Sequence, residues 1–271
     1  SAKRQQFVYD YFDWEYPEVV HWGHVQIDAY DVAMSTSTIK ERIEAGDLDG
    51  WDDPRAPTIQ SVKRRGIRGE AIVSAMVDLG TSTSNVDLSM STVYARNREL
   101  IDDETDRRFF VRAGVEPYPE ADPEPHEAVT LPVEGGPETA QPPLHPDHEE
   151  RGTRTIPVGD ALRLEAEDLP AEGERVWLKG FGAVRYAEDR LVATRDGLEI
   201  VTDGDVNVIH WVPASESVPV RMHTMDGVVT GWAEPGLGDY EPDELVQFER
   251  VGFARIDDQD GPETVTYFTH R

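Results

Sequence analysis

The sequence predicts an α+β protein with several domains, helical in its first part and built of antiparallel β-strands in its second. Up to about residue 110, short amphipathic stretches end at glycines. From Arg151 onward, short alternating apolar runs are separated by turn residues such as Asp196-Gly197 and Asp226-Gly227. About ten such runs are typical of barrels. At 271 residues the chain is long enough for two or three domains.

The charge balance is strongly acidic. The chain has 54 Asp and Glu residues against 26 Lys and Arg residues, a formal net charge of -28. Such an excess normally argues against a nucleic-acid partner. Molar salt removes this objection, because the Debye length falls to about 3 Å and surface carboxylates then keep the protein hydrated. Since arginine carries most of the positive charge, the composition indicates a protein from a halophile.

Composition also limits the setting. The chain has no cysteine, which excludes disulfides and thiolate metal sites. No apolar run approaches the length of a membrane span and no signal peptide is visible, so we expect a cytoplasmic protein without a membrane partner. The sequence begins at Ser1 without an initiator Met, so we expect it to be a fragment whose upstream part is missing.

The helical part is predicted element by element. Residues 18–30 are mostly extended, with β-branched and aromatic residues near alternation. A hydroxyl-rich stretch, residues 31–40, follows, and the pair Thr38 and Glu41 reads as a capping box that opens a helix at Thr38. Gly46 ends that helix. Further helices are expected over 58–65 and 70–79, and a longer one opens at Ser84.

The second part changes character at Val111. Residues 114–149 are rich in proline and glutamate and predict a long irregular connection. The strands expected after it include 175–178, 183–186, 190–194, 198–201 and 246–248. His145 and His148 lie in this connection, and we assign them no metal because further ligands are lacking.

Several stretches, in this order, together resemble one family. They are Trp14-Glu15-Tyr16-Pro17, Met34-Ser35-Thr36-Ser37, Gly50-Trp51-Asp52-Asp53-Pro54-Arg55, Arg64-Arg65-Gly66-Ile67, Asn97-Arg98, Arg108-Phe109-Phe110-Val111, Val208-Ile209-His210-Trp211-Val212 and Gln247-Phe248-Glu249-Arg250-Val251-Gly252. The series resembles the C-terminal half of archaeal-type glutamyl-tRNA synthetases, class I enzymes close to glutaminyl-tRNA synthetases. The resemblance covers nearly the whole chain.

The resemblance implies three regions. Residues 1–35 would end a class I Rossmann catalytic domain, residues 36–110 would form a helical stem-contact subdomain, and residues 111–271 would form two anticodon-binding β-barrels, one proximal and one distal. A loop at 33–38 would correspond to the KMSKS loop. Its residues Met34, Ser35, Thr36, Ser37 and Thr38 would hold the ATP phosphates while glutamate is activated to glutamyl-adenylate. Glutamate would then pass to the tRNA 3′ end.

This loop departs from the family pattern. Ala33 and Thr36 stand where the motif carries lysines, so bound Mg²⁺ is the expected counter-charge to the pyrophosphate. The HIGH motif and the glutamate-binding residues are absent and would lie upstream, together with most contacts to ATP and Mg²⁺. The chain alone is therefore expected to be catalytically incomplete, and no catalytic residue or metal ligand is assigned within it.

The expected tRNA contacts are basic residues. Phosphate contacts position RNA without reading its sequence, and the candidates in the helical region are Arg55, Lys63, Arg64, Arg65 and Arg68. Arg107 and Arg108 follow three acidic residues and are expected to pair with carboxylates instead. Resemblance to glutaminyl enzymes suggests Arg154, Gln247 and Arg250 as the residues that read the anticodon.

Aromatic residues admit two interpretations. Trp177, Trp211, Phe248 and Phe253 could stack on splayed anticodon bases, but we expect them in the barrel cores.

Alternatives remain open at this point. The nearest rival is a glutaminyl-tRNA synthetase. The Ser-Thr-Ser loop and the acidic composition favour a glutamyl enzyme, which could act on tRNA-Glu and possibly on tRNA-Gln. Other readings are a non-catalytic tRNA-binding β-barrel protein and a β-barrel interaction module without RNA. By resemblance we expect a monomer.

Overall fold

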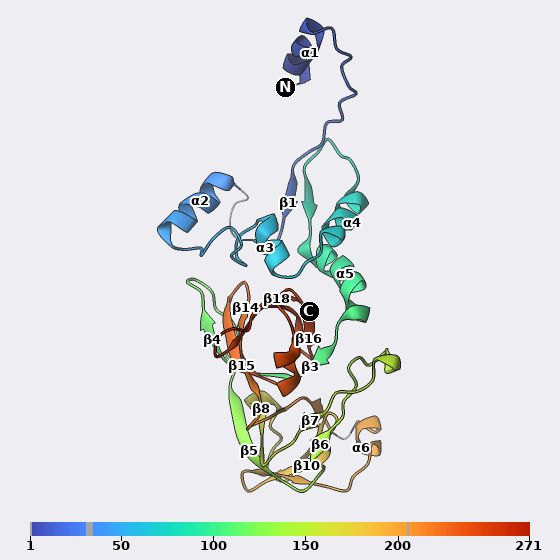
Figure 1. The fold of residues 1–271 in the computed structure, drawn as a ribbon, viewed down its shortest axis with the longest axis vertical. Helices are drawn as coiled ribbons and strands as arrows, with labels where there is room; N and C mark the ends of the chain where they lie inside the picture. Colours follow the sequence, from blue (N-terminus) through green and yellow to red (C-terminus); the bar gives the residue numbers. More distant parts are fainter. Residues whose placement is uncertain (1, 31–34, 205) are drawn as a thin grey trace.

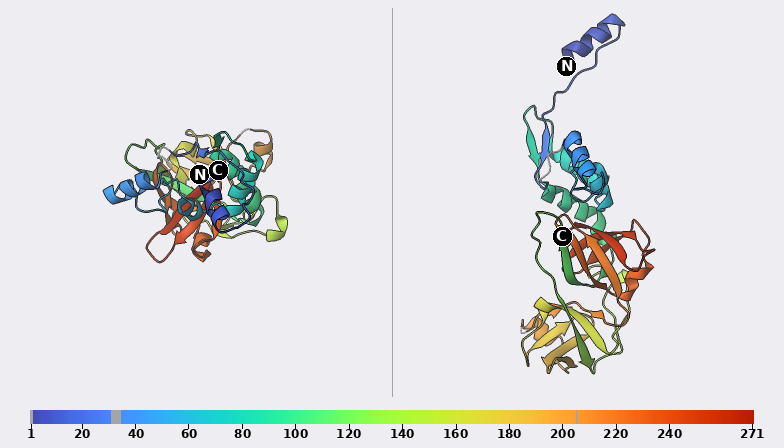
Figure 2. Two further views of the ribbon diagram at one scale, coloured as in Figure 1. Left: turned by 90° about the horizontal axis from the view of Figure 1, so that it is seen from above. Right: turned by 90° about the vertical axis from the view of Figure 1, so that its left-hand side faces the viewer.

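The computed structural model describes residues 2–30, 35–204 and 206–271. The described chain is elongated, as Figures 1 and 2 show. Helix α1 lies at one end, a helical unit follows, and two curled β-sheets complete the molecule. We call the sheet next to the helical unit the proximal sheet and the one at the far end the distal sheet.

The helical unit is built on a short apolar core. Val62, Ile67, Ala71, Leu88 and Val93 are buried in it. Its elements are β1 (Val25–Ile27), which pairs in parallel with β2 (Val86–Leu88), and the helices α2 (Thr36–Ala45), α3 (Ile59–Arg64), α4 (Gly69–Leu79) and α5 (Met90–Ile101), followed by a 3-10 turn at Asp102–Glu104. Helix α1 (Ala2–Tyr11) has no buried residue.

Helix starts differ from prediction at two places. Helix α2 begins at Thr36 with Ser35 as its N-cap residue, two positions before the predicted capping box, and no side chain caps it. Helix α5 begins after Ser89 rather than at Ser84, because residues 86–88 pair with β1. The Asp28 carboxylate accepts a hydrogen bond from the Met90 N–H at 3.0 Å. That cap comes from a residue distant in sequence, which local pattern does not reveal.

The proximal sheet has seven strands in the order β3-β16-β17-β18-β14-β15-β4. Its edge strands, β3 (Arg107–Arg108) and β4 (Phe110–Pro117), are separated only by Phe109, so the sheet curls until its edges meet (Figure 1). Phe110, Val246, Phe248 and Ile256 fill its core. The remaining strands are β14 (Val218–His223), β15 (Gly227–Ala233), β16 (Leu245–Phe248), β17 (Gly252–Asp258) and β18 (Thr264–His270), with a 3-10 turn at Pro235–Asp239.

The distal sheet curls in the same way. Its order is β12-β9-β10-β11-β5-β8-β13, and the edge strands β12 (Val208–Ile209) and β13 (Val212–Pro213) are separated only by His210 and Trp211. Trp211 and Leu164 are fully buried in its core. The other strands are β5 (Ala128–Glu134), β8 (Ala161–Glu165), β9 (Arg175–Leu178), β10 (Gly182–Ala187) and β11 (Arg190–Ala193).

Smaller elements border the distal sheet. They are the pair β6 (Thr139–Ala140) and β7 (Ile156–Pro157), the 3-10 turns Glu149–Arg151 and Ala166–Asp168, and helix α6 (Glu199–Thr202).

The β-rich second part is thus present as two curled sheets, with three corrections. The sheets are mixed rather than antiparallel, since β11–β5, β12–β9, β14–β18 and β16–β3 pair in parallel. Residues 114–149 are not one irregular connection, because they include the end of β4 and all of β5. The predicted strand 198–201 is wrong, since this stretch opens α6, where Ile200 alone is buried. One buried residue in four is compatible with a single helical turn as well as with a short strand, so the sequence pattern did not distinguish the two.

Arg65 fixes the helical unit to the proximal sheet. Its side chain is buried, and its Nη2 donates to the Thr269 carbonyl and to the Tyr94 hydroxyl, both at 2.8 Å. Its Nε donates to the Phe268 carbonyl at 3.2 Å. In return, the Thr269 hydroxyl donates to the Arg65 carbonyl at 2.5 Å. Asn97 and His270, both buried, contact each other at 3.0 Å beside this cluster.

Two further arginines cross the same boundary through aromatic rings. The Arg55 guanidinium lies 4.0 Å from the centre of the Tyr118 ring, and that of Arg64 lies 4.3 Å from the Tyr267 ring. His223 stacks on Tyr267 and contacts the Tyr118 hydroxyl at 3.2 Å. These are cation–π contacts, in which the guanidinium is attracted to the face of the ring. Each of the two arginines also pairs with an Asp carboxylate.

We predict that Arg65→Ala lowers the free energy of unfolding by about 2–4 kcal/mol, because it leaves two buried carbonyls without donors and opens a cavity. Denaturant unfolding at fixed KCl measures this change. The exposed neighbour Lys63 is the matched control, and Lys63→Ala should stay within about 0.5 kcal/mol of the parent. Equal stability of the two variants would contradict the assigned role of Arg65.

Candidate nucleic-acid interface

The hydroxyl-rich residues lie at the start of α2. Met34 is outside the described residues, whereas Ser35 is the N-cap residue and Thr36, Ser37 and Thr38 form the first turn. The Ser35 and Ser37 hydroxyls are 2.8 Å apart. Because no side chain caps α2 and the first N–H groups of a helix have no partner within it, this end of the helix is suited to an anion.

Three of the five predicted tRNA contacts have partners inside the protein, which the sequence interpretation did not anticipate. Arg65 is buried at the joint described above. Arg64 forms ion pairs with Asp52 at 2.9 Å and with Asp257 at 3.0 Å. Arg55 pairs with the buried carboxylate of Asp53, with contacts at 2.9 and 2.6 Å. Charge along the sequence does not reveal these partners, because Asp257 lies 193 residues from Arg64.

Lys63 and Arg68 remain on the surface. Lys63 is exposed and has no carboxylate within ion-pair distance among the described residues. Arg68 is exposed and pairs with Glu104 at 2.7 Å. Both residues line a cavity of about 510 Å³ between α3, the start of α4 and strand β16. Of the predicted cluster, these two cations are placed to meet a phosphate backbone.

Arg154 is enclosed between the two sheets. Its side chain is buried, its Nε donates to Glu234 at 2.8 Å, and its Nη2 donates to Glu249 at 3.2 Å. Its guanidinium also lies over the Phe109 ring. These partners give Arg154 a structural role between the two sheets and leave little of its side chain exposed. Its contact with the anticodon stays a prediction.

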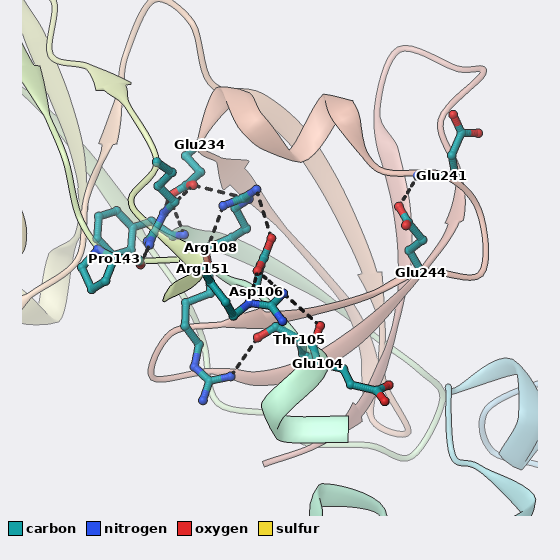
Figure 3. Close-up of polar contacts among 12 residues, drawn as sticks. Glu104, Thr105, Asp106, Arg108, Pro143, Arg151, Glu234, Glu241 and Glu244 are labelled. Carbon is teal, nitrogen blue, oxygen red and sulfur yellow. Dashed lines mark hydrogen bonds and ion pairs between the residues drawn. The ribbon is translucent and has the colours of Figure 1, made fainter. Parts of the chain in front are cut away.

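Arg108 occupies the same cluster with weaker contacts. Figure 3 shows it between Glu234 and Asp106, at 3.6 and 3.9 Å. These pairs agree with the expectation that Arg108 meets carboxylates. Its buried Nε nevertheless has no hydrogen-bond partner among the described residues. The Glu234 carboxylate lies 3.6 Å from this Nε and neutralises its charge without a hydrogen bond. No local sequence signal distinguishes Arg108 from Arg107.

Tyr240 lies beside Arg108, whose guanidinium is 5.2 Å from the centre of its ring. The Tyr240 hydroxyl is buried and also lacks a partner among the described residues. Burial raises the pKa of Tyr240 to about 12, so the hydroxyl keeps its proton and can donate.

Gln247 and Arg250 differ in exposure, because the side-chain oxygen of Gln247 is buried whereas the guanidinium of Arg250 is accessible. Gln247 pairs in register with Arg107 across β16 and β3, and its side-chain oxygen has no partner in the described chain. Arg250 occupies the turn between β16 and β17 with a φ of 66°. Its side chain is 42% exposed and its Nη2 contacts Asp168 at 2.7 Å. The bidentate pair holds the guanidinium in place while leaving one edge open to solvent.

A buried ion pair joins the two sheets next to Arg250. Arg112 of β4 contacts Glu165 of β8 through two bonds, at 2.7 and 2.6 Å. Burial opposes ionisation of Glu165, but the Arg112 guanidinium and the nearby His210 hold its pKa down at about 2. His210 is itself fully buried, which lowers its pKa, and its ring contacts the Phe110 carbonyl at 2.8 Å.

The aromatic residues separate into two groups. Trp211 and Phe248 are fully buried in the cores of the distal and proximal sheets, as expected. Phe253 is also fully buried, but it packs against His270 and Arg98 of α5 rather than in the core of the proximal sheet. Trp177 differs, because it is half-buried on the outer face of the distal sheet.

Metal and membrane features are both absent from the described ranges. No group of three or more His, Asp or Glu side chains there could hold a metal ion, so no residue of this chain is assigned to Mg²⁺. Across residues 2–30, 35–204 and 206–271, no helix is long and apolar enough to span a bilayer.

Comparisons with known proteins agree on one group. Two models described as tRNA synthetases class I (E and Q), anti-codon binding domain, match residues 124–203 and 208–257. A glutamate–tRNA ligase of Natronomonas pharaonis is 65% identical over the whole chain, and one of Halobacterium salinarum is 62% identical. One of Methanothrix thermoacetophila is 41% identical. The chain spans about half the length of these curated relatives, 45–46%.

We predict that Glu165→Gln lowers the free energy of unfolding by about 1–3 kcal/mol at pH 7, because it removes the buried carboxylate that makes the two short bonds to the half-buried Arg112 and leaves only the exposed Glu167 as its partner. Since the folded-state pKa of Glu165 is depressed, its contribution is present above pH 4.5 and is lost as the pH falls toward 2. The difference between variant and parent should therefore shrink between pH 5 and pH 2. Urea titrations across this range measure it.

Glu167→Gln is the matched control for this prediction. Its side chain is 67% exposed and contacts the same arginine at 3.3 Å. Little change in stability is expected from it. A constant gap between Glu165→Gln and the parent across the pH range would contradict the assignment.

Proposed function

Because the chain belongs to the family of archaeal glutamate–tRNA ligases, we propose that it is the tRNA-binding and anticodon-binding part of an enzyme that activates glutamate with ATP and transfers it to tRNA. The observation that carries this proposal is identity of 58–65% to halophilic ligases over the full chain. These relatives are ligases for glutamate and not for glutamine, which favours a glutamyl over a glutaminyl enzyme.

The start of α2 is proposed to contact ATP. Backbone N–H groups and the hydroxyls of Ser35, Thr36 and Ser37 would lie against the phosphates and stabilise the charge that develops as pyrophosphate leaves. Residues 1–35 would complete the Rossmann domain, and catalytic groups and Mg²⁺ ligands would come from the part of the enzyme outside this chain. What α2 supplies is positioning.

The RNA contacts are proposed on two surfaces. Residues 36–110 would follow the stem, with Lys63 and Arg68 beside phosphates. At the seam of the two sheets, Arg250 would face splayed anticodon bases, which are read by hydrogen bonds and stacking, with Gln247 of β16 beside it. Arg250 supplies an accessible guanidinium, and the Gln247 side-chain oxygen has no partner among the described residues. We further propose a cytoplasmic monomer that takes tRNA-Glu and possibly tRNA-Gln.

The test is aminoacylation by the longer protein, with glutamate and glutamine offered separately in molar KCl. Glutamate alone should be attached. Arg250→Ala should raise the KM for tRNA by roughly 5- to 100-fold, about 1–3 kcal/mol, with a smaller change in the rate of glutamyl-adenylate formation.

Arg221→Ala is the control for that variant, because Arg221 is a partly exposed arginine paired with Glu116 on the proximal sheet away from the seam. Attachment of glutamine instead of glutamate would overturn the proposed specificity. If Arg250→Ala aminoacylates tRNA with the same KM as the parent, the assignment of Arg250 to the anticodon site is wrong.

A further inference from the structure

The outer face of the distal sheet carries a tryptophan among arginines. In the register of β9 and β10, Trp177 faces Ala183 and Arg175 faces Arg185. The alternate residues Val176, Leu178 and Val184 are buried in the core, so the first set lies on the other face of the sheet, where Arg175 and Arg185 are exposed, Trp177 is half-buried and Ala183 is covered. This outer face, defined by Arg175, Trp177, Ala183, Arg185 and residues 194–196, lies at the end of the molecule farthest from α1 (Figure 1).

The arginines of this face are less engaged than those at the joints. Arg185 and Arg195 are exposed, and neither has a carboxylate within ion-pair distance in the described part of the chain. Arg175 pairs with Asp196 at 3.1 Å. In a chain with about twice as many acidic as basic residues, two arginines without a carboxylate partner among the described residues share this one surface.

A cavity of about 410 Å³ opens beside Trp177 and Phe181. Phe181 packs edge-on against the buried Trp211, with ring centres 6.1 Å apart, so its position is fixed by the core. Gly136 lies directly against this ring, since a Cβ there would come within 2.3 Å of it. Two aromatic side chains therefore line a hollow that has the size for one small ligand.

One acceptor completes the hollow. Asp196 takes a hydrogen bond from the Thr194 hydroxyl at 2.7 Å. That bond, together with Arg175, lowers the pKa of Asp196, so the group is an ionised acceptor at neutral pH. A carboxylate of this kind can accept from the exocyclic amino group or ring N–H of a base.

We propose that this outer face binds one unpaired nucleotide of RNA, with its base against Trp177, its edge toward Asp196 and its flanking phosphates near Arg185 and Arg195. An aromatic platform flanked by unpaired cations is the pattern by which proteins hold single-stranded nucleic acid. The proposal rests on the proposed tRNA-binding function and extends it to a surface away from the seam that holds Gln247 and Arg250. A protein partner is the alternative that the test separates.

The test measures binding of two RNAs in molar KCl: an isolated anticodon stem-loop and an acceptor-stem hairpin without that loop. Trp177→Ala should weaken stem-loop binding about tenfold, and Trp177→Phe should keep most of the affinity. Arg195→Ala should weaken it less and lower its salt dependence. The acceptor-stem hairpin should bind all variants equally. Trp51→Ala, which removes an exposed tryptophan of the helical unit, should leave stem-loop binding unchanged.

The outcomes are distinguishable. If the parent binds neither RNA, the proposed tRNA-binding function fails. If the parent binds the stem-loop but Trp177→Ala and Arg195→Ala bind it equally well, this inference fails while the function stands, as it would if the face served a protein. Equal losses on both RNAs would also overturn it. Circular dichroism checks folding, and if Trp177→Ala unfolds, Arg185→Ala and Arg195→Ala decide.

Discussion

Ion pairs and hydrogen bonds made by a small number of arginines hold the units of this acidic chain together. With 26 basic and 54 acidic residues, each cation has several possible partners inside its own chain. The most enclosed arginines lie where one unit meets the next. Arg65 lies between the helical unit and the proximal sheet, whereas Arg154 and Arg112 lie between the two sheets. Positive charge therefore serves first to hold the units in line, and only the remainder is available to RNA.

Closure of the sheets positions the candidate interface. The same short segment that carries both edges of the proximal sheet also carries Arg108, and the segment that closes the distal sheet carries His210. The seam between the sheets is thus built from closing segments, with a buried Arg112–Glu165 pair beside it. These contacts hold the seam beside Arg250 and Gln247, and the proposed base-reading site would require such support.

The spacing of apolar residues along the sequence predicted most of the helices and the change to β-structure, because this spacing shows which face of a helix or strand is buried. It failed where the deciding partner is distant. The cap of α5 comes from Asp28, and the burial of Arg65 depends on carbonyls at the C-terminal strand. β5 was missed because it contains a proline and lies in a stretch rich in proline and glutamate, which resembles a linker. A cluster of basic residues in a sequence shows where positive charge lies along the chain. It does not show which carboxylates the fold places next to those residues.

The central claim is that Arg64 belongs to the protein's own framework while its neighbour Lys63 belongs to the RNA surface. The slope of log affinity for tRNA against log[KCl] tests it most directly, since each phosphate contact contributes to that slope. Lys63→Ala should reduce the slope by roughly 1. Arg64→Ala should lower stability and leave the slope unchanged. An Arg64 variant that folds as the parent does and loses slope like Lys63→Ala would contradict the account.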